Sequence, residues 1–321
     1  MTPVFWQRRY PSANVVLLPG PRPVLVDTGF GPAASAMLGW LAGQGVALGN
    51  LRVVNTHAHT DHVGGNYTLA QHGVPIAMSA LDAAPIQARD PDACAAQFLA
   101  QPIEPFAVAH VLEAGDMIDT GAARWTVVPT PGHTAGHISL TNGDALVLGD
   151  AMHGADLGWA DLHHHPDALD WTAETLARLE RLPARVGYSG HGPAITDLPA
   201  AYARAQRRLQ RFRDDRAQVV WHAAKRNFAH HLMMEGGVAE AALHRQFTPM
   251  PWVAAFGAML GLAPGAFLTA LVAESVRADA ATWQDRVLHA TAPHDVPPPG
   301  WAQGPVRPAE WPYSMSTPAW R

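Results

Sequence analysis

Seven histidine and aspartate side chains in this sequence have the types and spacing of a site for two metal ions. They are His57, His59, Asp61, His62, His133, Asp150 and His191. The first four fall within one hexapeptide, and the other three each follow an apolar run. Residues two apart in an extended segment point to the same side, so His57 and His59 can share one cation. Mixed imidazole and carboxylate ligands favour zinc, with manganese, iron or cobalt as alternatives.

Four segments around these residues resemble motifs of the metallo-β-lactamase superfamily. Residues 57–62 match HxHxDH, residues 130–137 match PGHTxGH, Asp150 matches the bridging aspartate, and Gly190-His191-Gly192 matches the last histidine. Residues 27–29 match a further short segment, so the resemblance covers residues 10–195. The resemblance implies an αββα sandwich, in which two β-sheets face each other, helices lie outside them, and the metal ions sit at one edge.

The resemblance also implies which residue binds which of two divalent ions. The ligands implied for the first ion are His57, His59 and His133. Those implied for the second are Asp61, His62 and His191, with Asp150 bridging both. Two such cations share a water molecule and lower its pKa from 15.7 towards about 7, and the metal-bound hydroxide attacks a carbonyl carbon or phosphorus. Asp61 and Asp150 are therefore the expected catalytic residues, and Asp61 is expected to protonate the leaving group.

Other residues near these motifs have two interpretations each. Asp27 orients a ligating histidine or caps a turn. His153 and Trp159 are candidates for substrate binding, but they also fit a surface loop and the core. His137 is expected to be a buried structural histidine. Residues 163–165, three histidines before a proline, are expected to form a loop rather than a third metal site.

The first 200 residues alternate short apolar runs with helical patterns, which indicates an α/β fold. The predicted strands are Ala13–Leu18, Pro23–Val26, Leu51–Asn55, Val74–Met78, Arg124–Val128, Ile138–Thr141, Ala145–Leu148 and Arg185–Tyr188. The predicted helices are Ala33–Gln44, Asn66–His72, Leu81–Arg89, Asp92–Ala100 and Ala168–Arg181. Continuous apolar runs are typical of strands covered on both faces.

The pattern changes near residue 198. One long helix is predicted over Leu198–Ala223, a break at Gly236-Gly237, and three shorter helices up to residue 278. We therefore expect a catalytic domain over 1–197, a helical subdomain over 198–290 and a tail rich in proline and tryptophan over 291–321. The helical part is expected to act as a lid or a homodimer contact, and the tail to lie against this chain or a neighbour.

Composition restricts the classes of function. The net charge of −5 argues against nucleic acid as the main partner. A single cysteine excludes an intramolecular disulfide. The N-terminus has no signal-peptide pattern and no segment has the length of an apolar membrane span, so we expect a cytoplasmic protein that acts on small molecules without a membrane.

Two classes of hydrolase remain open. The first hydrolyses small carboxylic esters, lactones or thioesters. The second is a phosphodiesterase or ribonuclease whose phosphate contacts come from six arginines between residues 204 and 216. Their spacing of three to four residues places several on one helix face, which is more typical of a solvated surface than of a phosphate-binding one. We predict the first class, with the second as the alternative.

Overall fold

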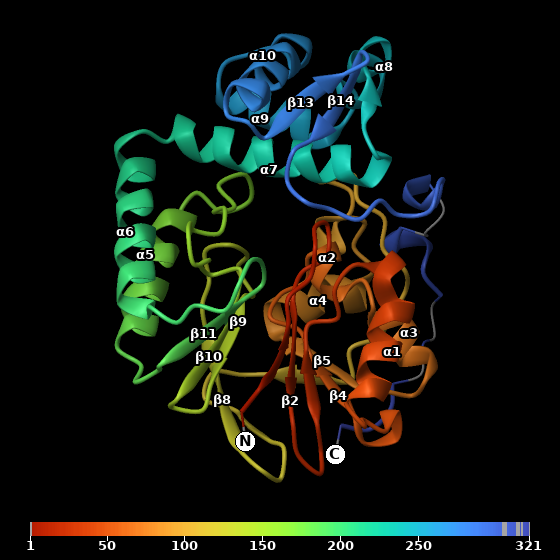
Figure 1. Cartoon of the computed structure of the whole chain (residues 1–321), viewed down its shortest axis with the longest axis vertical. Helices are drawn as coiled ribbons and strands as arrows, with labels where there is room; N and C mark the ends of the chain where they lie inside the picture. Colours follow the sequence, from red (N-terminus) through yellow and green to blue (C-terminus); the bar gives the residue numbers. More distant parts are fainter. Residues whose placement is uncertain (1, 304–306, 313–314, 316, 321) are drawn as a thin grey trace.

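The computed structural model describes residues 2–303, 307–312, 315 and 317–320. Two β-sheets lie face to face, and helices cover the outer face of each (Figure 1). The predicted αββα sandwich is therefore confirmed. Both chain ends lie at the end of the sandwich opposite the C-terminal helices.

The first sheet has six strands in sequence order. They are β1 (Val4–Trp6), β2 (Val15–Leu18), β3 (Val24–Val26), β4 (Arg52–Val54), β5 (Ile76–Ser79) and β6 (His110–Leu112). β1, β2 and β3 pair antiparallel, whereas β3 to β6 run parallel. Helices return the chain between the parallel strands: α1 (Ala34–Gly43), α2 (Thr60–Val63), α3 (Asn66–Gln71) and α4 (Ala80–Ala88).

The second sheet has five strands in the order β11-β10-β9-β8-β7. They are β7 (Met117–Asp119), β8 (Arg124–Pro129), β9 (Ile138–Thr141), β10 (Ala145–Gly149) and β11 (Val186–Ser189). All pairs are antiparallel except β10 with β11, which α5 (Ala168–Glu180) connects.

Alternation along β2 shows how the layers pack. Val16 and Leu18 face the second sheet and share a core with Trp125 of β8 and Val147 of β10. Val15 and Leu17 face the other way, into the core beneath α1 and α4. Successive strand residues point to opposite faces, so one strand of four apolar residues serves two cores. A third core lies between the outer face of the second sheet and the pair α5 and α6 (Leu198–Asp214).

A separate apolar core forms the C-terminal part. It is built from α7 (Ala217–Glu235), α8 (Glu240–Phe247), α9 (Pro251–Met259), α10 (Pro264–Arg277) and a small sheet of β12 (Val238–Ala239), β13 (Ala281–Gln284) and β14 (Val287–Ala290). These elements lie across one end of the sandwich, with α7 nearest to it (Figure 1). The region is mainly helical as predicted, but the three-stranded sheet was not predicted. The predicted domain boundaries stay proposals.

Two predicted helices are wrong. Asp92–Ala100 forms turns and a single short 3₁₀ segment, Ala93–Ala95. Asp92 accepts a hydrogen bond from the backbone N–H of Phe98, and Cys94 has a positive φ of 61°. Side-chain acceptors of this kind compete with the helical hydrogen bonds. The turns direct Phe98 and its neighbour Leu99 into the C-terminal core.

The second error concerns the predicted helix Leu198–Ala223, which is two helices. Asp215 is extended (φ −144°, ψ 96°), and its side chain accepts a hydrogen bond from the N–H of Ala217. This aspartate therefore ends α6 and supports the start of α7. The predicted break at Gly236-Gly237 is confirmed, because Gly236 has the left-handed conformation (φ 68°) and ends α7.

The three tryptophans of the tail all contact this chain. Trp311 is buried beside Phe106, Trp301 packs edge-on against Phe30, and Trp320 stacks on His110. Tail residues 304–306, 313–314, 316 and 321 lie outside the described residues. Within the described part of the chain no single helix suits a membrane span, and α9 with α10 passes by length and composition only as a pair bent by 86°.

Candidate metal centre

The side chains predicted to bind metal follow the ends of strands from both sheets. Residues 57–62 follow β4, His133 follows β8, Asp150 follows β10, and His191 follows β11. These strand ends meet at the edge of the sandwich that α7 covers. All seven predicted residues come together there, in three overlapping groups whose ligand atoms lie within 4.8 Å of one another.

The first group consists of three imidazoles. His59 Nδ1 lies 3.1 Å from His57 Nε2 and 2.9 Å from His133 Nε2, and the latter two nitrogens are 3.2 Å apart. Three ligands at zinc–nitrogen distances on a tetrahedron are separated by about 3.3 Å. The three nitrogens therefore form a triangle of about the size that one zinc ion needs. Its sides are slightly shorter than the ideal separation.

The second group mixes imidazoles with carboxylates. His191 Nε2 lies 3.1 Å from Asp61 Oδ2, and His62 Nε2 lies 3.9 Å from the same oxygen. Asp150 lies between the groups, because its Oδ1 is 3.4 Å from His62 Nε2 and its Oδ2 is 3.7 Å from His133 Nε2. Its carboxylate is therefore placed to contact two ions.

Two buried atoms at this position support a metal site. His62 Nε2 and Asp150 Oδ1 are both inaccessible and have no hydrogen-bond partner among the described residues. Buried polar atoms without partners cost free energy, so they are rare unless something else satisfies them. A divalent cation between them would do so. The residues present thus fit the ions that the sequence motifs imply.

Asp27 supports this site from behind, as one of its two predicted interpretations requires. Its Oδ2 accepts a hydrogen bond of 2.7 Å from Nδ1 of His62 and another from the hydroxyl of Thr56, which lies 3.1 Å from Nδ1 of His57. The N–H of Thr56 donates to Asp27 Oδ1. Both histidines therefore keep Nε2 free for a metal. Asp27 has a positive φ of 59°, an uncommon conformation for aspartate.

Hydrogen bonds also fix the orientation of His133 and of the neighbouring His137. His133 Nδ1 donates to the backbone carbonyl of Trp159, which leaves Nε2 for the metal. His137 is buried, and its Nε2 accepts a hydrogen bond from the N–H of Asp150 while Nδ1 contacts Thr130. His137 thus positions the loop of Asp150, in agreement with the predicted structural role.

Electrostatics at the centre follow from burial and neighbouring charges. Burial lowers the pKa values of His57, His59 and His133, so these imidazoles are neutral, the form that binds metal. Burial opposes charge on His62 as well, but the carboxylates of Asp27, Asp150 and Asp61 raise its pKa. Conversely, burial raises the pKa of Asp150, but neighbouring imidazoles hold that pKa well below its usual range.

Close packing explains the glycine before His191. A Cβ atom on Gly190 would lie 2.1 Å from Asp150 Oδ1 and 2.6 Å from Cε1 of His62. Any larger residue would displace both side chains. The glycine therefore lets the strand end approach the second group of ligands.

A pocket of about 230 Å³ opens directly over the predicted metal ligands. His59, Asp61, His133, Asp150 and His191 form its floor. Apolar side chains of Leu99, Trp159, Ala223 and Met233 line much of the remaining wall. The pocket therefore combines a charged floor with an apolar wall, as small-molecule sites commonly do.

The sequence motifs did not indicate the polar residues in the roof of this pocket. Asn227 and His230 of α7 both line it, three residues apart and so on one helix face. Asn227 Nδ2 and His230 Nε2 are buried and have no hydrogen-bond partner among the described residues. Gln101 connects this roof to the floor, since it contacts the hydroxyl of Thr60 and donates to Asn227 Oδ1.

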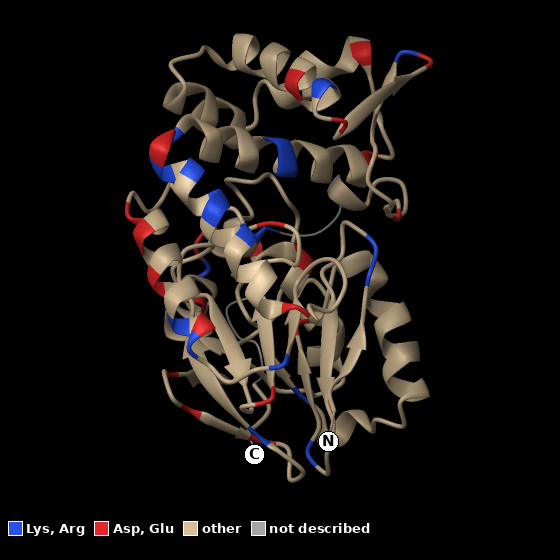
Figure 2. Ribbon diagram, turned by 60° about the vertical axis from the view of Figure 1, so that its left-hand side comes forward, with Lys and Arg blue, Asp and Glu red and all other residues tan. Residues whose placement is uncertain are grey.

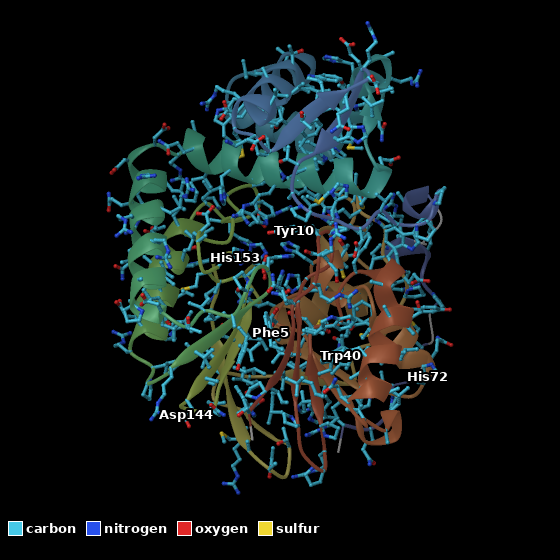
Figure 3. All side chains as sticks on the ribbon, in the orientation of Figure 1. Phe5, Tyr10, Trp40, His72, Asp144 and His153 are labelled. Carbon is cyan, nitrogen blue, oxygen red and sulfur yellow. The ribbon has the colours of Figure 1, made fainter. Side chains whose placement is uncertain are left out.

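Of the two predicted substrate-binding residues, Trp159 lines this pocket, whereas His153 lines a neighbouring cavity. The Trp159 indole stacks nearly parallel to the ring of His59, with centroids 5.9 Å apart. His153 is buried, and its Nε2 lies 4.0 Å from Asp150 Oδ2. Tyr10, which was not predicted, stacks on His191. Figure 3 shows Tyr10 and His153 at the end of the sandwich that faces α7.

The other histidine cluster lies in a loop, as predicted. His164 contacts Asp161 and Asp92, and His163 stacks on Phe98. The 92–100 segment is therefore held against the loop between β10 and α5. These histidines do not belong to any of the three metal-type groups found in the described residues.

Comparison with known proteins agrees with this geometry. Residues 9–191 match the family model described as the metallo-beta-lactamase superfamily. A metallo-beta-lactamase domain-containing protein 1 from Xenopus laevis is 31% identical over 191 residues, which cover 57% of this chain and 71% of that protein. The acyl-coenzyme A thioesterase MBLAC2 of Bos taurus is 32% identical over 207 residues, or 55% of this chain and 73% of that protein.

A more distant relative and two solved structures complete the comparison. A hydroxyacylglutathione hydrolase from Rhodospirillum rubrum is 30% identical over half of each chain (50% and 52%). A metallo-beta-lactamase family protein from Thermus thermophilus matches 90% of this chain and 98% of its own, with a TM-score of 0.54 and 23% identity. The lactamase MIM-2 matches 62% and 84%, with a TM-score of 0.50 and 24% identity. These two similarities concern the fold.

Proposed function

Because the chain belongs to the metallo-β-lactamase superfamily, we propose that it is a dinuclear metal-dependent hydrolase of small thioesters and related esters or lactones. The observation that carries this proposal is the convergence of five imidazoles and two carboxylates beneath a largely apolar pocket. Relatives named for thioester hydrolysis, MBLAC2 and hydroxyacylglutathione hydrolase, favour thioesters among these substrates.

The residues that would hold the ions are those grouped by geometry. His57, His59 and His133 suit one ion, Asp61, His62 and His191 the other, and Asp150 both. Divalent cations, zinc above all, would lower the pKa of water there and polarise the substrate carbonyl.

The chain's own side chains would do the rest. The unpaired Nδ2–H of Asn227 would donate a hydrogen bond to the carbonyl oxygen. His230, in the tautomer that carries the proton on Nε2, would donate to the same oxygen or to a polar group of the acyl chain. Trp159 and Met233 would hold the acyl group and exclude water. Asp61 lies on the pocket floor, hydrogen-bonded to His191, where it could pass a proton to the departing sulfur or oxygen.

The alternative is a phosphodiesterase or ribonuclease that uses the arginines of α6. Several of these arginines already have partners. Arg208 pairs with Asp156, and Arg213 pairs with Asp170. Arg216 donates to the carbonyl of Pro166. The basic face is thus partly neutralised by the chain itself, which favours the ester class.

One experiment separates these classes. Purified, metal-quantified protein is offered a short acyl thioester, a lactone and bis(p-nitrophenyl) phosphate under the same conditions. The proposal expects thioester turnover that stops on chelation and returns on adding zinc. Turnover of the phosphodiester alone would reverse the assignment.

A further inference from the structure

A groove leads from the metal centre to the arginine-bearing face of α6. Tyr10, His191 and Arg226 line both the pocket over the metal ligands and this groove. The groove then passes His153 and reaches Arg204. The two cavities therefore share walls, and a substrate in the pocket can extend into the groove.

The outer end of this groove opens into a recess dominated by arginine. Arg204 and Asp156 line both groove and recess, and the recess adds Arg207, Arg208 and Arg211. Four guanidinium groups thus surround one carboxylate. Figure 2 shows basic residues following one another along the helix that carries them.

The single carboxylate cannot neutralise these arginines because it is already engaged. Asp156 accepts from Arg208 Nε at 2.8 Å, from Arg226 Nη2 at 3.0 Å and contacts His222 Nε2 at 3.1 Å. These contacts, with the charge of Arg226, hold the pKa of Asp156 well below its usual value although burial opposes this. Asp156 therefore binds Arg208 and Arg226. The outer arginines of the recess, Arg204, Arg207 and Arg211, do not pair with it.

The outer arginines are available for a ligand. The side chains of Arg207 and Arg211 are exposed and make no ion pair or hydrogen bond with the described residues. Arg204 uses only its Nε, which donates to the carbonyl of Gly154. The three lie on one helix face and extend over about 10 Å of its axis. A row of free guanidinium forks of this kind suits phosphate oxygens rather than a single small carboxylate.

We infer that the substrate is the thioester of a phosphorylated thiol, whose phosphates bind Arg204, Arg207 and Arg211. This inference rests on the proposed function. The acyl group would fill the pocket beneath α7, a flexible arm would lie in the groove past Tyr10 and His153, and the phosphates would reach α6. The arginines therefore bind the leaving group and select it by charge.

The chemistry balances without a further reactant. A bond forms between the oxygen of water and the thioester carbonyl carbon, and the carbon–sulfur bond breaks. The sulfur leaves with the bonding electron pair and takes up one proton, while the acyl group leaves as a carboxylic acid. The phosphates are not cleaved, so α6 contributes binding only.

The test compares two thioesters that differ in phosphate. Values of kcat/KM are measured at low salt for acetyl-coenzyme A and for S-acetylpantetheine, which lacks all phosphate. We expect a preference for the phosphorylated thioester that falls on the order of tenfold in the R207Q/R211Q double variant. The preference should also shrink with added salt, because the contacts are exposed.

A matched control comes from the same helix. R213Q removes one positive charge, half of what the double variant removes, from a residue that pairs with Asp170 outside the recess, so the preference should persist. ADP should compete with acetyl-coenzyme A, and less so in R207Q/R211Q. Folding of each variant is checked by its thermal transition.

Several outcomes would overturn the inference. One is an equal kcat/KM for the two thioesters in the wild type, and another is a preference that R207Q/R211Q leaves unchanged. RNA cleavage that is lost in the double variant would assign the arginines to nucleic acid instead. Equal turnover of both thioesters would leave the proposed function standing, whereas no turnover of either, with the metal sites loaded, would refute the proposed function itself.

Discussion

Asp27 lies 2.7 Å from Nδ1 of His62, although the two residues are 35 positions apart in the chain. The same carboxylate binds Thr56, which in turn contacts His57. One buried aspartate therefore orients a histidine at each of the two proposed ion positions, at the cost of a left-handed backbone conformation.

The first prediction concerns this carboxylate. Asp27→Asn keeps the shape but removes the charge and one acceptor, so we expect about 10- to 100-fold weaker metal affinity, as for other residues that support ligands. Competition with a chromophoric chelator measures it. Asp144→Asn, at an exposed hairpin, is the control, and equal affinities in both variants would contradict the role given to Asp27.

The second prediction concerns metal removal and stability. Without ions, three neutral imidazole nitrogens crowd together in a buried site with no cation to bind them, and the carboxylates of Asp61 and Asp150 lose the ions that would contact them. We expect a lower melting temperature after dialysis against a chelator, restored by zinc in a concentration-dependent way. Differential scanning calorimetry at two zinc concentrations tests this. Identical transitions with and without zinc would speak against a built metal site.

The third prediction separates two adjacent histidines of α7. His230 has a buried Nε2 without a described partner, whereas His231 Nε2 contacts the backbone carbonyl of Leu99 at 2.8 Å. We expect His230→Ala to lower kcat/KM on the order of tenfold with little loss of stability. His231→Ala should instead destabilise the fold by roughly 1–3 kcal/mol or more.

Steady-state kinetics and thermal unfolding of both variants measure this contrast. Asn227→Ala should resemble His230→Ala, because its Nδ2 is also buried and unpaired. If His230→Ala matched the wild type in kcat/KM for every active substrate, the roof of the pocket would have no part in substrate binding.

The fourth prediction concerns pH and the loop of His164. Hydrogen bonds to Asp161 and Asp92 raise the pKa of His164 to about 10. Because this pKa exceeds that of an unfolded histidine, about 6.5, the ion pairs of His164 stabilise the folded state fully when the pH is below about 6.5. This stabilisation then declines as the pH rises and is lost as the pH passes through about 10.

His164→Gln should therefore lower the melting temperature at pH 6 and have little effect near pH 10.5. Thermal unfolding of wild type and variant across this range tests the sign. A destabilisation that grew with pH would contradict the ion-pair assignment. His165→Gln, in the same loop, is the control.

The strand ends, and the histidines and aspartates that gather beyond them, were predictable from sequence because both correspond to short local patterns. Apolar runs before His57, His133 and Asp150 located β4, β8 and β10, and the motifs that follow are short and contiguous. The strand-end positions then imply a common edge.

Contacts made by the C-terminal part were not predictable in the same way. The hairpin of β13 and β14 turns at Asp285 and Arg286, both with positive φ, without the glycine or asparagine that normally signals such a turn. Likewise Asn227 and His230 look like ordinary helix residues. Their place in the pocket depends on the break at Asp215, after which α7 runs over the pocket.

The most direct test of the whole account is thiol release from a short-chain acyl thioester by protein stripped of metal and then reloaded. We predict no release by the stripped chain, and recovery that saturates at two equivalents of zinc per chain. Undiminished release by fully stripped protein, or recovery that needs no residue of the His57, His59 and His133 group, would contradict it.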